Sequence, residues 1–358
     1  MDRVQVGLIG ANSERGWSAR SHLPALAALE ELELAAVATS RMETARATAD
    51  RYRARRAYAD ADELIADPDV ELVVVTVRVA KHHALVRAAL DAGKDVLCEW
   101  PLACGTAGAE DLVERAVRSG RRHFIGLQAA ATPEVRLGRR MIDDGAIGEV
   151  RAVTVRAAAA TGGTPFPADG RYLFQPDVRT SLLSIQVAHI LAGVTRLVGP
   201  LVASSGLSRT RYPRVQLSET GEVVDAPYSD HAAIVAATAD DVLISLNVAT
   251  GVPGNPGTVI EVTGSSGTLR LESTGPLQYT DVRLLVSAPG RPHAEVPVSA
   301  PYRRAPARLT DRAAAGVAEL YLAIADDLHG SGPAAPTFAE AVATHRLLDD
   351  TGITVPSA

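Results

Sequence analysis

A glycine-containing segment near the N-terminus has the residue types needed to hold a dinucleotide. Val4 to Ile9 is a short apolar run with β-branched residues, and it leads through Gly10 into a loop and then a helix. A dinucleotide fold needs small residues at such a turn, because the backbone must approach the pyrophosphate and offer N–H groups to it. The spacing departs from G-x-G-x-x-G, and by itself the segment also fits a purely structural strand–loop–helix turn. We expect the cofactor to contact Gly7, Gly10, Asn12, Ser13, Arg15, Gly16 and Trp17.

The end of the second predicted strand indicates which nucleotide is bound. This strand ends in Ala38-Thr39-Ser40-Arg41, without a carboxylate. An acidic residue at this place binds the free ribose hydroxyls of NAD, whereas a hydroxyl beside an arginine favours the 2′-phosphate of NADP. We therefore expect Ser40 and Arg41 to select NADP(H) over NAD(H). The alternative is that Ser40 only caps the following helix and Arg41 is a solvated surface charge.

Few side chains could move a proton during hydride transfer with such a cofactor. The cofactor supplies the hydride, but reduction of a ketone also requires a proton for the alkoxide. A histidine is the best donor, because the unperturbed pKa of imidazole suits neutral pH. The family resemblance given below implies that it is His189, and Tyr172 and His82 are weaker candidates. The alternatives are a His189 that is hydrogen-bonded in a domain interface and a buried Tyr172 with a satisfied hydroxyl. No Cys/His cluster has the spacing of metal ligands, so we expect no metal.

Strands and helices alternate through the first third of the chain, which predicts a doubly wound parallel sheet. Apolar strands are expected at 4–9, 32–39, 70–77, 95–99 and 123–127, and helices at 22–29, 42–52, 61–66, 81–92 and 108–119. The strand at 70–77 is almost continuously apolar, as is usual where both faces of a parallel sheet are covered. This Rossmann domain is expected to span residues 1–127.

The pattern changes near Gly148, where alternating strands separated by short turns predict antiparallel hairpins. Residues 128–358 are therefore expected to form an α+β domain on a large, open, mainly antiparallel sheet, with substrate-binding and oligomerisation roles. The Gly/Pro-rich segment 161–167 is expected to be a loop over a site. The tail returns to helix at 310–329 and 338–349, and these helices could pack on the first domain.

Composition excludes several classes of protein. The net charge of −6 gives no general electrostatic reason to bind nucleic acid, and no window approaches the ~20 apolar residues of a membrane span. The chain enters a strand almost at once and shows no secretion signal, so a cytoplasmic location is expected.

Together these elements resemble the glucose–fructose oxidoreductase and inositol dehydrogenase (Gfo/Idh/MocA) family. The segments that carry the resemblance are 66–70 (ADPDV), 92–99 (AGKDVLCE) and 145–150 (GAIGEV). The chain is most similar to the branch that contains the fungal galactose-pathway repressor and its bacterial relatives. The segments for this branch are 15–17 (RGW), 21–24 (SHLP), 77–82 (VRVAKH), 99–102 (EWPL) and 126–128 (GLQ).

The resemblance places two altered motifs beside the cofactor. The family has Glu-Lys-Pro, with lysine as its usual proton donor and acceptor, where this chain has Glu99-Trp100-Pro101. An indole has no group that titrates near neutral pH, so Trp100 would form a flat wall of the substrate pocket. The family's Asp-x-Gly-x-His motif reads Ile185 to His189 here, and only the histidine is kept. Further cofactor contacts implied by the resemblance are Val77, Arg78, His82, Glu99, Trp100 and Gln128.

The expected function is that of an NADP(H)-dependent oxidoreductase without the usual lysine. Its substrate would be a keto-sugar or similar carbonyl, or an imine, because an iminium ion already carries its proton. The alternative is a non-catalytic NADP(H)-binding sensor or regulator, since the fungal repressor binds a dinucleotide without being an enzyme. The resemblance also implies a homodimer or homotetramer built through the open sheet.

Overall fold

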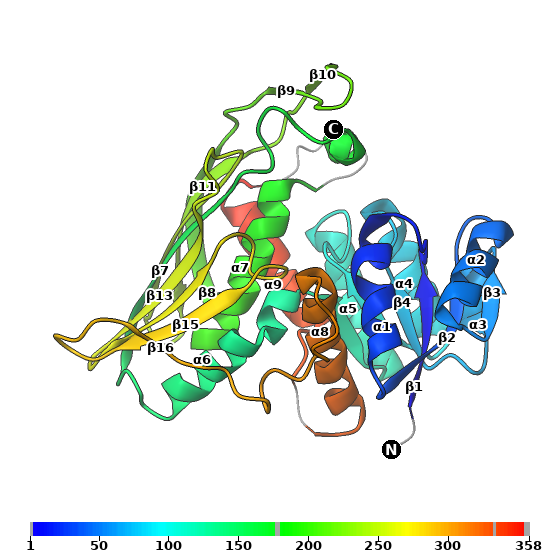
Figure 1. The fold of residues 1–358 in the computed structure, drawn as a ribbon, viewed down its shortest axis with the longest axis horizontal. Coiled ribbons are helices and arrows are strands. Elements are labelled where there is room, and N and C mark those ends of the chain that lie inside the picture. The colour runs from blue at the N-terminus through cyan, green and yellow to red at the C-terminus, as the bar shows by residue number, and fades with distance from the viewer. Residues whose placement is uncertain (1–2, 176–179, 332–333, 354–358) are drawn as a thin grey trace. The chain divides into compact units, whose positions relative to one another are not determined.

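The computed structural model describes residues 3–175, 180–331 and 334–353, which form two compact units (Figure 1). The first unit contains residues up to Ala131 together with Arg304–Val342, and the second contains Thr132–Arg303 and the residues from Ala343 onward. The chain thus leaves the first unit after residue 131 and returns to it from residue 304. The predicted fold class, a Rossmann sheet followed by a mainly antiparallel sheet, is confirmed.

A six-stranded parallel sheet forms the centre of the first unit, in the order β3-β2-β1-β4-β5-β6. The order reverses between β1 and β4, and such a reversal is where open α/β sheets bind their ligands. Its strands are β1 (Val4–Ile9), β2 (Leu32–Ala38), β3 (Arg56–Tyr58), β4 (Leu72–Val75), β5 (Asp95–Glu99) and β6 (His123–Gly126). The expected strand at 70–77 is shorter, although the N–H groups of Glu71 and Thr76 on its two sides still donate to the carbonyls of Gln5 and Ile9 in β1.

The helices of this unit follow the predicted alternation, with one departure. A five-residue π-helix, η1 (Ser18–His22), precedes α1 (Leu23–Ala28), where the sequence predicts one helix from residue 22. The others are α2 (Met42–Tyr52), α3 (Ala61–Ala66), η2 (Val79–Lys81), α4 (His82–Asp91), α5 (Thr106–Ser119) and η3 (Gln128–Ala131).

The tail helix α8 (Arg312–Leu328) belongs to the core of the first unit. It packs against η1, α1 and η3, and Tyr321 is fully buried there with β1 residues such as Val6 and Leu8. Fully burying one large apolar side chain contributes roughly 1.5–3 kcal/mol, so the Rossmann sheet depends on residues from the far end of the chain. The last helix, α9 (Phe338–Asp350), runs from the first unit into the second.

An eight-stranded sheet forms the second unit, in the order β16-β15-β14-β13-β7-β12-β11-β8. All neighbouring strands are antiparallel except β7 and β12. Helices α6 (Pro133–Asp143) and α7 (Leu182–Val198) pack on the sheet. The strands are β7 (Val150–Ala159), β8 (Leu201–Arg209), β11 (His231–Thr238), β12 (Leu243–Thr250), β13 (Gly257–Gly264), β14 (Thr268–Ser273), β15 (Val282–Ser287) and β16 (Ala294–Glu295).

A smaller layer accompanies this sheet. Strands β9 (Arg214–Gln216) and β10 (Val223–Asp225) form a hairpin next to the 3-10 helix η4 (Ala168–Phe174). The expected loop at 161–167 ends against them, because Phe166 is buried among Leu173, Val215 and Leu217 and its N–H donates to the carbonyl of Gln216. This end of the loop is therefore anchored rather than free.

Gly7 has a packing role in the sheet. It lies within β1, and a Cβ added there would be 2.7 Å from Leu64 Cδ2 and 2.8 Å from Val70 Cγ1. These distances leave no space for a side chain, so Leu64 of α3 and Val70, two residues before β4, pack directly on the backbone. The structure thus gives Gly7 a reason to be glycine that differs from the cofactor contact expected from the sequence.

We predict that Gly7→Ala destabilises the protein by about 1–3 kcal/mol, because the added methyl group forces Leu64 and Val70 apart. Urea unfolding measures the effect. Gly105→Ala is the matched control, since Gly105 is in extended backbone and an added Cβ would meet nothing within 4 Å. Equal stability of the two variants would contradict the packing role.

Candidate functional site

The loop after β1 has the geometry of a nucleotide-binding turn. Gly10 has a φ of +89°, and an added Cβ would lie 2.9 Å from Thr76 Oγ1 and 3.0 Å from Val77 Cγ1, so the loops after β1 and β4 approach closely only because Gly10 lacks a side chain. Gly16 also has a positive φ, of +84°, and its Cβ position is open. The turn therefore presents bare backbone at the point where the strand order reverses, which fits a dinucleotide pyrophosphate.

Side chains within this loop hold its shape. Asn12 Oδ1 accepts hydrogen bonds from the backbone N–H groups of Glu14 and Arg15, at 2.8 and 3.2 Å. Ser18 Oγ donates to the carbonyl of Gly10 at 2.9 Å. Of the remaining predicted contacts, Ser13 is buried, Arg15 is exposed, and Trp17 packs against the core of the unit. Asn12 thus orders the loop, which leaves Arg15 on its surface.

The loop at the end of β2 carries the two side chains, Ser40 and Arg41, from which the sequence predicts a 2′-phosphate site. Thr39 Oγ1 donates to the carbonyl of Arg41 at 2.7 Å and accepts from its N–H, so Thr39 is turned back into the loop. Ser40 is half-buried and the Arg41 side chain is exposed. The first carboxylate after the strand belongs to Glu43, inside α2. The loop therefore offers a hydroxyl and a guanidinium.

His82 joins two loops at the carboxyl ends of the strands. Its ring is buried, with Nδ1 2.7 Å from the carbonyl oxygen of Pro101 and Nε2 2.8 Å from that of Val77. Both contacts are hydrogen bonds only when both ring nitrogens carry protons, while burial lowers the pKa of His82. Val77 and the neighbouring Arg78 lie in the turn after β4. His82 thus connects this turn to the segment that carries Trp100.

Trp100 follows β5 directly and is 8% exposed. Cys98, two residues before it, is fully buried, and burial raises the pKa of its thiol well above the usual range. A buried thiol of that kind is inert as a nucleophile. Neither side chain supplies a group that titrates near neutral pH at the position where the family has lysine.

Glu99 is the centre of a buried hydrogen-bond network. Its Oε1 accepts from His22 Nε2 at 3.1 Å and from Gln128 Nε2 at 3.0 Å. His22 Nδ1 lies 2.7 Å from the hydroxyl of Tyr321, and both of these side chains are fully buried. The network brings together the end of β5, η1, η3 and α8. Two of its members, Glu99 and Gln128, are predicted site residues, whereas His22 and Tyr321 are not.

In the second unit, helix α7 carries His189 on a buried face. Ser181 caps the helix by accepting from Ser184 N–H at 3.1 Å. His189 is 6% exposed, and burial lowers the pKa of its imidazole to about 3. The reason given for His189 as a proton donor, a pKa near neutrality, therefore does not hold in this structure. A neutral His189 can still donate or accept a hydrogen bond.

Gln186 lies one helical turn before His189 and is also buried, at 5% exposure. Within the part of the chain that the structure describes, neither Gln186 Nε2 nor His189 Nδ1 has a hydrogen-bond partner. Residues three apart share a helix face, so the two groups are neighbours. Leaving a buried polar group unpaired costs roughly 1–3 kcal/mol, so water or a polar ligand would supply the bonds that the protein does not make to this pair.

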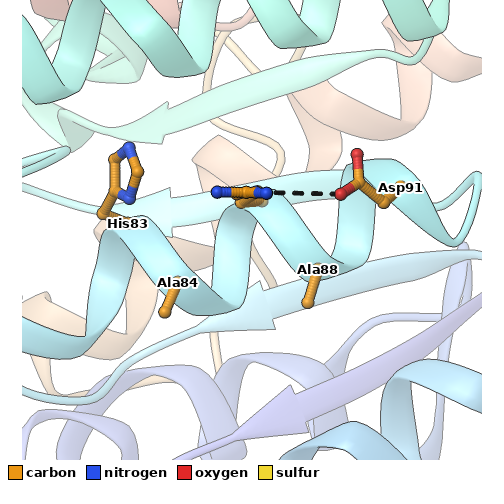
Figure 2. Close-up of a pocket in the computed structure, with 5 residues that line it drawn as sticks. His83, Ala84, Ala88 and Asp91 are labelled. Atoms are coloured by element: carbon orange, nitrogen blue, oxygen red, sulfur yellow. Dashed lines mark ion pairs between the residues drawn. The ribbon is translucent and has the colours of Figure 1, made fainter.

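Tyr172 lies on η4 and is 39% exposed, so the alternative of a buried phenol is wrong. A shallow depression on the outer side of α4 is lined by His83, Ala84, Arg87, Ala88 and Asp91 (Figure 2). It holds an Arg87–Asp91 ion pair and none of the predicted site residues.

Across the described residues, no group of three or more His, Cys, Asp or Glu side chains could hold a metal ion.

Sequence reasoning missed three polar residues at these positions. His22 is in the segment 21–24 that supports the resemblance, yet its partner Tyr321 is 299 residues away, so no local pattern connects them. Gln186 lies inside the altered motif at 185–189, where a polar residue in a largely apolar helix could have indicated a functional position.

Within the described ranges, every helix is too short or too polar to span a bilayer.

Comparison with known proteins agrees with both units. Residues 4–127 match the model of an oxidoreductase family with an NAD-binding Rossmann fold, and residues 133–273 match that of the Gal80p C-terminal domain. Dehydrogenase aclE of Aspergillus oryzae is 27% identical over 285 residues, which cover 75% of this chain and 77% of the relative.

Two further proteins represent an enzyme and a regulator. The galactose/lactose metabolism regulatory protein GAL80 of Saccharomyces cerevisiae is 24% identical over 198 residues. The matched region covers 52% of this chain and 46% of that relative. The solved structure of levoglucosan dehydrogenase with NADH superposes with a TM-score of 0.83 at 20% identity, covering all of both chains. Residues 4–127 thus belong to the Gfo/Idh/MocA oxidoreductase family, and residues 133–273 are of the Gal80p C-terminal type.

Proposed function

We propose that this protein is an NADP(H)-dependent oxidoreductase that transfers a hydride between the nicotinamide and a small polar substrate. The observation that carries the NADP(H) preference is the end of β2, where Arg41 is exposed beside Ser40 and no carboxylate meets the ribose. A guanidinium suits a 2′-phosphate because it forms bidentate, charge-assisted hydrogen bonds. The bare backbone at Gly10 supports the same cofactor at its pyrophosphate. When bound, the nicotinamide supplies or accepts the hydride.

The candidate residues of each unit, taken separately, favour a substrate that needs little help with its proton. Trp100 cannot exchange one, and His189 is neutral because burial lowers its pKa to about 3. His189 and Gln186 would orient a carbonyl or hydroxyl oxygen by hydrogen bonding rather than protonate it. An imine substrate brings its own proton as the iminium ion, and a keto-sugar would draw its proton from water. Both substrates remain within the proposal, and a panel of NADPH-oxidation assays on cyclic imines and keto-sugars separates them.

A regulator is the second candidate, because residues 133–273 match the C-terminal domain of Gal80p and the relative GAL80 is a regulatory protein. It would bind the nucleotide without turning it over. The same panel distinguishes the two functions: tight NADPH binding without oxidation by any substrate supports the regulator. Oxidation of NADPH with a single substrate class supports the enzyme.

The open face of the second-unit sheet supports a homo-oligomer. Leu207 on β8, Val235 on β11 and Leu243 on β12 are each more than half exposed, and the strand register places them on one face. Exposed apolar side chains gathered in this way are typical of protein interfaces. We propose that a second copy of the chain covers them, in a dimer or tetramer that light scattering would detect.

Replacement of Arg41 tests the choice of cofactor. We predict that Arg41→Ala weakens NADPH binding at least tenfold and leaves NADH binding unchanged, because only NADPH carries the 2′-phosphate. Ser40→Asp should reverse the preference by placing a carboxylate at the ribose hydroxyls. Calorimetric titration measures both. Arg118→Ala is the control, since Arg118 lies in the last turn of α5 and pairs with Glu114. Equal losses for NADPH and NADH in Arg41→Ala would contradict the proposed preference.

Replacement of Trp100 by lysine tests whether the lack of a proton donor at this position limits the reduction of ketones. We predict that Trp100→Lys raises kcat on keto-sugars at least tenfold relative to imines, because general acid catalysis contributes roughly 10²- to 10⁴-fold. Trp100→Phe keeps an aromatic ring without a titrating group and should leave the ratio of the two rates unchanged. An unchanged ratio in the lysine variant would show that the proton comes from elsewhere.

His189 should make the fold sensitive to acid. Its pKa is lowered from 6.5 to about 3, so the unfolded chain binds a proton that the folded protein does not. The stability contribution is complete above about pH 6.5 and is lost as the pH falls toward 3, reaching a loss of about 2 kcal/mol at pH 5. Urea unfolding of the wild type and His189→Gln at pH 7 and pH 5 measures the difference. The variant should lose less stability between these values, and an identical loss would contradict the assignment.

A further inference from the structure

The outer strand of the Rossmann sheet is covered by the tail of the chain. Strand β6 has a single neighbour within its sheet, which is β5. On its other side the N–H of Ile125 donates to the carbonyl of Pro336 at 2.9 Å, and Phe124 forms an antiparallel bridge with Thr337. An uncovered strand edge invites pairing with other chains. Residues 335–338, which we call the strap, therefore conceal the edge of β6.

A histidine on β6 receives the first N–H of helix α9. Phe338 begins this helix, and its N–H donates to His123 Nδ1 at 3.3 Å. The two rings are stacked, with their centroids 5.1 Å apart and an angle of 29° between their planes. The N–H groups in the first turn of a helix have no partner within the helix, so the imidazole caps one of them. Because Nδ1 accepts this bond only without a proton, the docked strap requires that form of His123.

The first turn of α9 fixes the direction of the Phe338 N–H. Glu340 Oε2 accepts from the N–H of Thr337 at 2.6 Å and from its Oγ1 at 3.1 Å, as in a capping box. The carbonyl of Thr337 accepts from the N–H of Ala341 at 3.1 Å, and the Phe338 side chain is fully buried. The N–H therefore cannot turn to another acceptor while the strap is docked.

Protonation of His123 removes this acceptor and places a positive charge at the positive end of a helix. Both effects oppose docking of the strap. The face of the Phe338 ring attracts a cation and acts in the other direction. Burial nevertheless lowers the pKa of His123, so the docked ring binds a proton less readily than the released ring. Docking is therefore strongest above the ordinary pKa of 6.5 and weakens as the pH falls below it.

Neighbouring charges do not alter this direction. The charged or titratable side chains on the elements next to His123 are Arg121 and Arg122 on the preceding turn, Asp95 on β5, Arg115 and Arg118 on α5, and Glu340 and His345 on α9. Burial alone lowers the pKa of His123, without a contribution from these charges. Burial also lowers the pKa of His345, to about 4, so His345 stays mostly neutral at pH 5.

We propose that His123 is an acid-sensitive latch, which holds the strap on the edge of β6 when neutral and releases it when protonated. Acid would then expose a strand edge that is concealed at neutral pH. The far end of the tail stays attached, because the carbonyl of Gly352 accepts from Ser208 Oγ on β8 at 2.7 Å. The release is therefore local. It goes beyond the proposed function and requires no cofactor.

Hydrogen exchange of the full chain tests the latch at the amides of Ile125 and Phe338, after correction for the intrinsic pH dependence of exchange. Their protection should fall about tenfold between pH 7 and pH 5. The ceiling is about 30-fold, because the released His123 has its ordinary pKa of 6.5. His123→Asn supplies an acceptor that does not titrate, so its protection should stay constant over this range. His123→Phe keeps a stacked ring without an acceptor and should lose protection by the same factor at both pH values.

His329→Asn is the matched control, because His329 is exposed at the end of α8, a few residues before the strap. It should reproduce the pH dependence of the wild type. Constant protection in the wild type between pH 7 and pH 5 would overturn the inference. An equal fall in His123→Asn, or loss of the fall in His329→Asn, would also overturn it, because another group would then be responsible. None of these outcomes depends on NADPH binding, so they leave the proposed function untouched.

Discussion

A half-buried carboxylate at the end of β5 is the constraint on which the nicotinamide side of the first unit depends. Removing a carboxylate from water is costly unless donors replace the lost hydration. Glu99 obtains two of them from His22 and Gln128, which requires η1 and η3 to lie next to β5. His22 in turn requires the hydroxyl of Tyr321, so α8 must return to the sheet. A single charge thus connects four elements that are far apart in the sequence.

The sequence predicts the parts of this arrangement that follow from local patterns. Alternating apolar strands and helices predict the Rossmann sheet, and the antiparallel hairpins after Gly148 predict the second one. For Ser40 and Arg41 after β2, the residue types alone are enough to predict a partner for the 2′-phosphate of NADP. The pairing of His22 with Tyr321 could not be predicted, because it arises from the packing of a tail helix. The packing role of Gly7 could not be predicted for the same reason: the space beside it is taken by Leu64 and Val70, which the N-terminal pattern does not reveal.

Burial changes the chemistry that residue types suggest. A histidine chosen for a pKa near neutrality becomes a poor acid once desolvation lowers that pKa to about 3. The imidazole nitrogen of His189 and the amide of Gln186 remain as neutral, directional groups on one helix face. Such groups recognise the positions of oxygens rather than charges, which suits a polyol, a hydroxy-ketone or a hydroxylated imine. The second unit can therefore contribute specificity even though it contributes no acid.

Loss of the lysine also changes the electrostatics of the first unit. In the family's Glu-Lys-Pro arrangement the two charges largely cancel, whereas Trp100 leaves the charge of Glu99 without that neighbour. The nicotinamide ring is positive only in its oxidised form. Two opposite unit charges 8 Å apart attract by about 2 kcal/mol at an effective dielectric constant of 20. For a nicotinamide ring at such a distance from Glu99, this attraction would stabilise the oxidised cofactor and would make the reduced one a better hydride donor. The same field would attract a cationic iminium more strongly than a neutral ketone, so the replacement of lysine by tryptophan would favour the substrate class that needs no acid.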